Sequence, residues 1–150
     1  MKGRSELAPY LANLGHGDVK EHSAQTMTRA YADSVFVPAP RGWRVLDCFR
    51  DYEATRMGAI PVVVADGRSD EVERSFGHYY REPPGSLPPW VFAKSWTEAG
   101  DMMVALMKNM TALEEMQAAN LRWWDRVNYN LRRGIYEALR DNDALPPPSS

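Results

Sequence analysis

Residues 40–53 form a short stretch, rich in arginine, with the side chains best suited to bind an anion. Gly42 permits close approach by a backbone, and Arg41, Arg44 and Arg50 add three positive charges. Charge-assisted hydrogen bonds from guanidinium groups contribute roughly 1.5–3 kcal/mol each, whereas a helix N-terminus adds only about 0.3–1 kcal/mol. The arginines would therefore dominate binding of an anionic group, and a diphosphate is the anion we expect.

One carboxylate, that of Glu53, follows Arg50 by three positions, so the two side chains share one side of a helix. In that position the carboxylate could accept hydrogen bonds from two hydroxyls of a sugar such as ribose. The alternative is an ordinary Arg50–Glu53 surface ion pair, worth about 0.2–0.5 kcal/mol. Spacing alone leaves both interpretations open.

The elements that would position these groups begin with an apolar run over residues 34–37, which predicts a buried strand. We expect Pro38 and Pro40 to end it, because proline cannot donate to a strand ladder. A helix is then predicted, with an acidic N-cap at Asp47 and with Gly58 as the residue after its end. The arginine-rich loop thus joins a strand to a helix N-terminus.

A second strand is predicted over residues 60–65, where apolar residues follow one another without alternation, as in a strand covered on both faces. Strand, helix and strand in this order form a βαβ unit, whose two strands are parallel neighbours. Because open α/β sheets bind ligands at the carboxyl ends of their strands, the loop lies at the expected binding edge. The predicted fold class is α/β, a Rossmann-like parallel sheet flanked by helices, with a long C-terminal helix.

The rest of the chain is predicted to complete one domain over residues 1–145, followed by a disordered Pro/Ser tail over residues 146–150. The other predicted elements are a short helix over residues 7–14, a helix over 24–33, an irregular connection over 67–89, a strand over 90–93, a helix capped by Ser95, and a long amphipathic helix from a cap at Thr111 to about Arg140.

Composition argues against several classes of function. The 150 residues include 18 Lys and Arg against 20 Asp and Glu, and a net charge of −2 offers no overall attraction for nucleic acid. Cys48 is the single cysteine and cannot form an internal disulfide. The three histidines lack the spacing of metal ligands, and no window reaches the ~18–20 apolar residues of a membrane span. We therefore expect no metal, no required cofactor and no membrane span.

The motifs around the loop resemble those of exostosin-like glycosyltransferases. The shared pattern is a strand, a Pro-x-Gly loop at Pro40, an Arg-x-x-Glu-Ala helix at Arg50 and a Gly-x-x-Pro-Val strand at Gly58, within which Gly58 and Pro61 are structural. The likeness is close over about residues 30–66 and loose over the remainder. It implies the carboxyl-terminal, nucleotide-sugar-binding half of an enzyme with two Rossmann-like domains (GT-B type).

By this resemblance, Gly42 and Arg50 map to the diphosphate of a nucleotide sugar, and Glu53 maps to its ribose. Family members usually carry serine where Asp47 stands in this sequence. An acid beside a diphosphate is repulsive unless it caps the helix and faces away, so we expect Asp47 to do so. No residue is assigned as the catalytic base.

The resemblance also implies partners and a compartment. The donor would be a UDP-sugar, the acceptor a glycan or glycoprotein, and the transferred group a hexose or pentose. Activity would depend on a further N-terminal domain or a partner chain, and the family works in the Golgi lumen or at its membrane. The alternative is a non-catalytic interaction domain that kept this fold and acts through surfaces rich in tryptophan and methionine, including Trp123 or Trp124.

Overall fold

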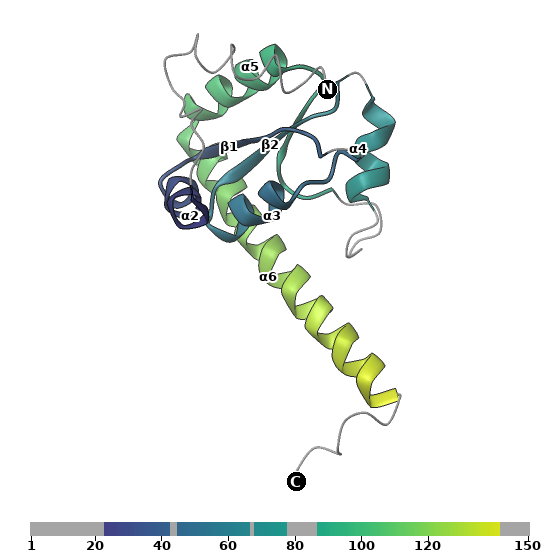
Figure 1. Cartoon of the computed structure of the whole chain (residues 1–150). Coiled ribbons are helices and arrows are strands. Elements are labelled where there is room, and N and C mark those ends of the chain that lie inside the picture. The colour runs from purple at the N-terminus through teal and green to yellow at the C-terminus, as the bar shows by residue number, and fades with distance from the viewer. Residues whose placement is uncertain (1–22, 43–44, 67, 78–86, 142–150) are drawn as a thin grey trace.

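The structure is a computed structural model, and it describes residues 23–42, 45–66, 68–77 and 87–141. Three parallel strands form a sheet in the order β1-β2-β3, with helices on both faces (Figure 1). The predicted α/β class and long C-terminal helix are confirmed. The elements are α2 (Ala24–Ala32), β1 (Phe36–Ala39), α3 (Phe49–Arg56), β2 (Ile60–Val64), α4 (Ser69–Phe76), β3 (Val91–Ala93), α5 (Trp96–Met107) and α6 (Met110–Asp141).

The central strand β2 is buried along its whole length, as its unbroken apolar run predicts. Val63 faces the side of α4, where it joins a cluster that contains Phe76 and Trp90. Val62 faces the opposite side, where Trp96 and Leu113 from α5 and α6 cover it. The sheet is thus the middle of three layers, and its carboxyl edge carries the loops that lead into α3, α4 and α5.

The first strand differs from the prediction, because β1 runs over Phe36–Ala39 and includes Pro38. The Ile60 amide donates to the Val35 carbonyl, and backbone groups alternate sides along a strand. The amide position of Pro38 therefore faces away from β2, so the missing N–H removes no ladder bond. The expectation that Pro38 ends the strand was wrong because β1 is an edge strand.

Helix α3 begins one residue later than predicted, with Cys48 rather than Asp47 as its N-cap. The Cys48 amide donates to Asp51 Oδ2 at 2.9 Å. The carboxylate of Asp51, in the first turn of α3, therefore stabilises the start of the helix at Cys48. The other end is as predicted, because Gly58 has φ 86°, a left-handed conformation that favours glycine.

Two helix assignments need correction. Helix α4 lies within residues 67–89, where we expected only an irregular connection, and it carries two acids in its first turn, Asp70 and Glu71. Helix α6 begins at Met110, because the Asn109 side chain accepts from the Ala112 amide at 3.1 Å, so Thr111 is not its cap. The predicted helix over residues 7–14 and the tail over 146–150 lie outside the described residues.

Helix α6 is fixed to the sheet by the fully buried Asn120. Its Oδ1 accepts from Trp90 Nε1 at 3.0 Å, and its Nδ2 donates to the Ala59 carbonyl at 2.8 Å. These partners immediately precede β3 and β2. Beyond Val127 the helix extends away from the sheet (Figure 1). Apolar side chains such as Ile135 are exposed in this part of the helix.

Candidate functional site

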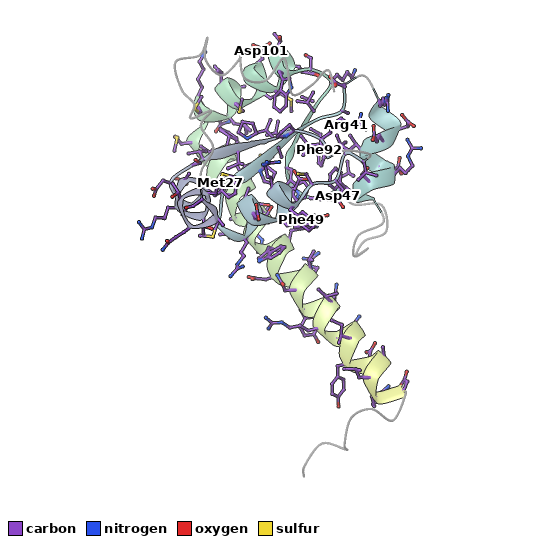
Figure 2. The ribbon with its side chains drawn as sticks, in the orientation of Figure 1. Met27, Arg41, Asp47, Phe49, Phe92 and Asp101 are labelled. Carbon is purple, nitrogen blue, oxygen red and sulfur yellow. The ribbon has the colours of Figure 1, made fainter. Side chains whose placement is uncertain are left out.

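The carboxyl edge of the sheet brings together residues that follow β1 and β2. Arg41 Nη2 lies 2.7 Å from Glu71 Oε1, and Arg68 Nη1 lies 3.9 Å from Glu71 Oε2. The Glu71 side chain is only 8% exposed. In Figure 2, Arg41 and Asp47 are labelled between α3 and α4. Arg41, expected to meet a diphosphate, therefore joins the loop after β1 to the first turn of α4.

The loop after β1 is closed tightly at Gly42. A Cβ atom built there would lie 2.9 Å from the Asp47 carbonyl oxygen and 3.2 Å from that of Val45. Both neighbours are backbone atoms, which cannot move aside as a flexible side chain would. The local need for glycine at position 42 is therefore the closure of its own loop.

Arg50 lies in the first turn of α3 and is half-buried. Its Nη1 donates to Cys48 Sγ at 3.6 Å, a weak acceptor. The guanidinium also lies near the phenol of Tyr31 from α2: burial raises the pKa of that phenol, and the charge of Arg50 acts in the opposite direction. Arg50 forms no ion pair with any described carboxylate. Several of its N–H donors therefore have no acceptor among the described residues.

Glu53 lies one turn further along α3, and its side chain is exposed. Its carboxylate makes no hydrogen bond or ion pair with any described residue, so the surface pair with Arg50 that its spacing allowed is not formed. Glu53 is nevertheless near enough to Tyr31 for its charge to raise the pKa of the phenol. Tyr31, Arg50 and Glu53 thus form one group across α2 and α3.

Asp51 is a fully buried carboxyl directly beside this group. Its pKa is raised to about 8, chiefly by burial and to a smaller extent by the nearby Asp47, although the hydrogen bond from the Cys48 amide and the charge of Arg50 act in the opposite direction. Its Oδ1 has no hydrogen-bond partner among the described residues. At neutral pH the neutral form predominates, so Asp51 places little negative charge under the first turn of α3.

The expected site residues are therefore only partly gathered. Arg50 and Glu53 lie together, Arg41 is held by Glu71, and Arg44 lies outside the described residues. The residues expected to be structural are placed as follows: Asp47 is half-buried before the cap, Gly58 ends α3, and Pro61 is fully buried in β2.

Sequence reasoning missed Tyr31, Asp51 and Glu71. Only Asp51 carried a local signal, since it follows Cys48 at the spacing of a capping box.

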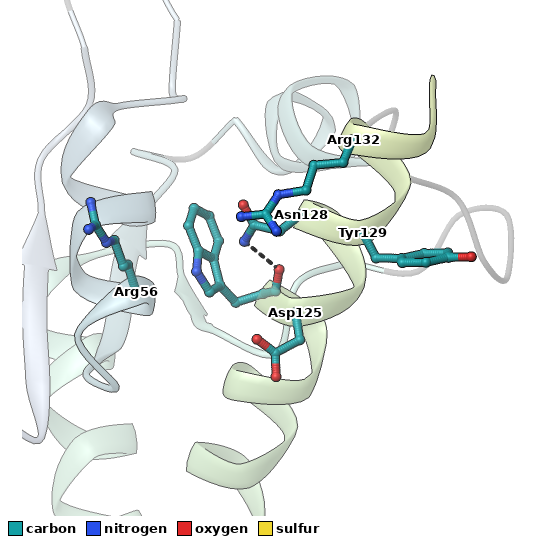
Figure 3. A pocket seen from close by; sticks show the side chains of 6 residues that line it. Arg56, Asp125, Asn128, Tyr129 and Arg132 are labelled. Atoms are coloured by element: carbon teal, nitrogen blue, oxygen red, sulfur yellow. Dashed lines mark hydrogen bonds between the residues drawn. The ribbon is translucent and has the colours of Figure 1, made fainter. Parts of the chain in front are cut away.

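A separate groove of about 470 Å³ lies between α3 and α6 (Figure 3). Arg56 borders it from the last turn of α3, so it is at the opposite end of that helix from Arg50. Neither Arg56 nor Arg132, across the groove, is paired with a described residue. The lining residues are Arg56, Trp124, Asp125, Asn128, Tyr129 and Arg132.

The described residues contain neither a candidate metal site nor a candidate membrane span. No group of three or more His, Cys, Asp or Glu side chains there is arranged to hold a metal ion. In the same part of the chain, no helix combines the length and apolar character that crossing a membrane requires.

Comparisons with known proteins give one match. A family model described as the RXYLT1 C-terminal domain matches residues 16–142. The searches of curated proteins and of solved structures found no match. The family match spans most of the chain, and it supports at a coarse level the exostosin-like glycosyltransferase resemblance of the loop motifs. The chain therefore belongs to the family of RXYLT1 C-terminal domains, a glycosyltransferase-related family.

Proposed function

We propose that this chain is the donor-binding domain of a glycosyltransferase and that it holds a nucleotide diphosphate sugar, with UDP-sugars as the expected class. The observation that carries the proposal is the arrangement of Arg50 and Glu53. A half-buried guanidinium without a carboxylate partner among the described residues lies one helical turn from an exposed carboxylate that is equally unpaired there. Both project from the helix that follows the carboxyl end of β1, in a chain from a glycosyltransferase-related family.

In this proposal Arg50 and the first-turn amides of α3 bind the diphosphate, and the carboxylate of Glu53 accepts from the ribose hydroxyls. Gly42 and Arg44 belong to the loop beside the phosphates. Arg41 contributes by shaping that loop, because Glu71 already engages its Nη2 atom. The neutral form of the buried Asp51 makes the arrangement compatible with an anion.

Isothermal titration of UDP into the full chain tests the assignment. We expect Glu53→Gln and Arg50→Ala each to weaken binding by roughly tenfold or more, as for loss of a hydrogen bond to a charged group. The matched control is Glu114→Gln, which removes an exposed carboxylate from α6. If both site variants bound UDP as tightly as the control, the donor site would have to lie elsewhere.

We further propose that transfer needs an acceptor-binding part that supplies the catalytic base, from another domain or a partner chain. The acceptor would be a glycan or glycoprotein, and the compartment would be the Golgi, with which the family is typically associated. Fluorescence microscopy of the tagged full-length protein in its native cell tests the compartment, and staining outside the Golgi would contradict it.

A second candidate function is a non-catalytic interaction domain, and the distal half of α6 favours it. Leu131, Ile135 and Leu139 recur every four residues there and are all exposed. Light scattering with and without UDP-sugars separates the two candidates. A stable oligomer that binds no nucleotide sugar would favour the interaction domain, whereas a chain that binds UDP would favour the donor site.

A further inference from the structure

Tyr31 presents a buried polar group that the fold does not explain. The residue is 8% exposed, and its hydroxyl oxygen is buried without a hydrogen-bond partner among the described residues. Its ring packs in a cluster with Val37 from β1 and Ala54 from α3. A phenylalanine would fill the same apolar space without burying an unbonded hydroxyl, so the hydroxyl costs stability where it stands.

The hydroxyl lies near groups of the proposed donor site. Three groups of α3 and its cap lie near it: the Arg50 guanidinium, the Glu53 carboxylate and the Cys48 thiol. The Arg50 guanidinium is adjacent, although the two groups do not meet hydrogen-bond geometry in this conformation. Its Nη1 is directed instead at Cys48 Sγ, a much weaker acceptor than a phenol oxygen.

We propose that Tyr31 is a positioning residue of the donor site. When a diphosphate binds, the Arg50 guanidinium reorients and donates a hydrogen bond to the hydroxyl oxygen of Tyr31. This bond holds the plane of the guanidinium so that it faces the phosphates. One edge of a planar guanidinium is then held by the protein, and the remaining N–H groups serve the anion. The unbonded hydroxyl is thus kept for binding, at a cost in stability of the fold.

The inference rests on the proposed function, and Tyr31→Phe tests it in the full chain with UDP as the probe. Titration calorimetry should show binding weakened by roughly tenfold, as for a lost hydrogen bond to a charged group. The melting temperature should rise by roughly 2–4 °C, because a buried unbonded hydroxyl is removed. A purely structural role would not produce lower affinity together with higher stability.

Two further variants make the test specific. Tyr52→Phe is the matched control, because that ring packs on Trp90, with centroids 5.8 Å apart, and its substitution should leave UDP binding unchanged. In an Arg50→Ala background, Tyr31→Phe should have no further effect on affinity, since Tyr31 acts through Arg50.

The outcomes separate the inference from the function beneath it. If the Tyr31→Phe variant bound UDP as tightly as the unsubstituted chain, the inference would be overturned, but the proposed donor site would not be contradicted. The inference would also be overturned if Tyr31→Phe lowered the melting temperature, or if it weakened UDP binding by the same factor in the Arg50→Ala background. No binding of UDP by the unsubstituted chain would overturn both.

Discussion

Asp51 makes the stability of this fold depend on pH in a direction unusual for a carboxylate. Burial raises its pKa from 3.8 to about 8 in the folded chain. Between those values the folded state binds more protons than the unfolded state, so the free energy of unfolding falls as the pH rises. Below the pKa of Asp51 in the unfolded state, the free energy of unfolding does not change with pH through this group. Above its pKa in the folded state, the decrease in the free energy of unfolding is complete. Most aspartates, whose pKa is lowered on folding, behave in the opposite way.

The magnitude follows from the size of the pKa shift. Each pH unit between the two values costs about 1.4 kcal/mol, so Asp51 lowers the free energy of unfolding by about 3 kcal/mol between roughly pH 5 and 7. The variant Asp51→Asn has no ionisable group at this position, and its side-chain amide oxygen can still accept from the Cys48 amide. We therefore expect the variant to lack this slope and to be the more stable protein at neutral pH.

Urea unfolding followed by circular dichroism across this pH range measures the effect in the wild type and in Asp51→Asn. The difference between the two proteins isolates Asp51 from other titrating groups. Asp101→Asn, which alters an exposed aspartate on α5, is the matched control and should follow the wild type. Parallel stability curves for the wild type and Asp51→Asn would refute the reasoning, because the carboxyl would then titrate similarly in both states.

Further substitutions test the packing around the site, each by urea unfolding. Asn120→Leu leaves Trp90 Nε1 and the Ala59 carbonyl buried without partners, so we expect a loss of about 2–5 kcal/mol; a loss below about 1 kcal/mol would mean that water replaces both bonds. Gly58→Ala should lower the free energy of unfolding by about 1–2 kcal/mol, because φ is 86° at this position. Space is not the reason, since the added Cβ atom would lie 4.0 Å from Leu121 Cδ2, an ordinary van der Waals contact. Gly134→Ala, on the exposed part of α6 with open space around it, should instead stabilise by about 0.8–1 kcal/mol, and equal effects of the two alanines would contradict the backbone explanation.

Much of the fold followed from local patterns along the chain. The unbroken apolar run over residues 60–65 predicted a strand covered on both faces, and β2 is buried throughout. Gly58 marked the end of α3, and Ser95 capped α5 as predicted, since its side chain accepts from the Glu98 amide. Helix α4 was missed because its flanking glycines and prolines outweighed a single apolar pair, Val72 and Phe76.

The site was harder to predict, because its important contacts join distant parts of the chain. Glu71 lies 30 positions from Arg41 in sequence, so no spacing rule could show that the pair would form. The hydroxyl of Tyr31 lies near Arg50 only because α2 packs against α3. Local motifs could therefore suggest Arg50 and Glu53 as candidates but not the groups that surround them.

The prolines of β1 have a consequence for how this molecule meets others. Pro38 directs its ring nitrogen away from β2, and Pro40 follows directly after the end of the strand. A foreign strand approaching that margin of the sheet would find no amide hydrogen at either place and could not extend the ladder. The two prolines thus disfavour edge-to-edge association of molecules through β1.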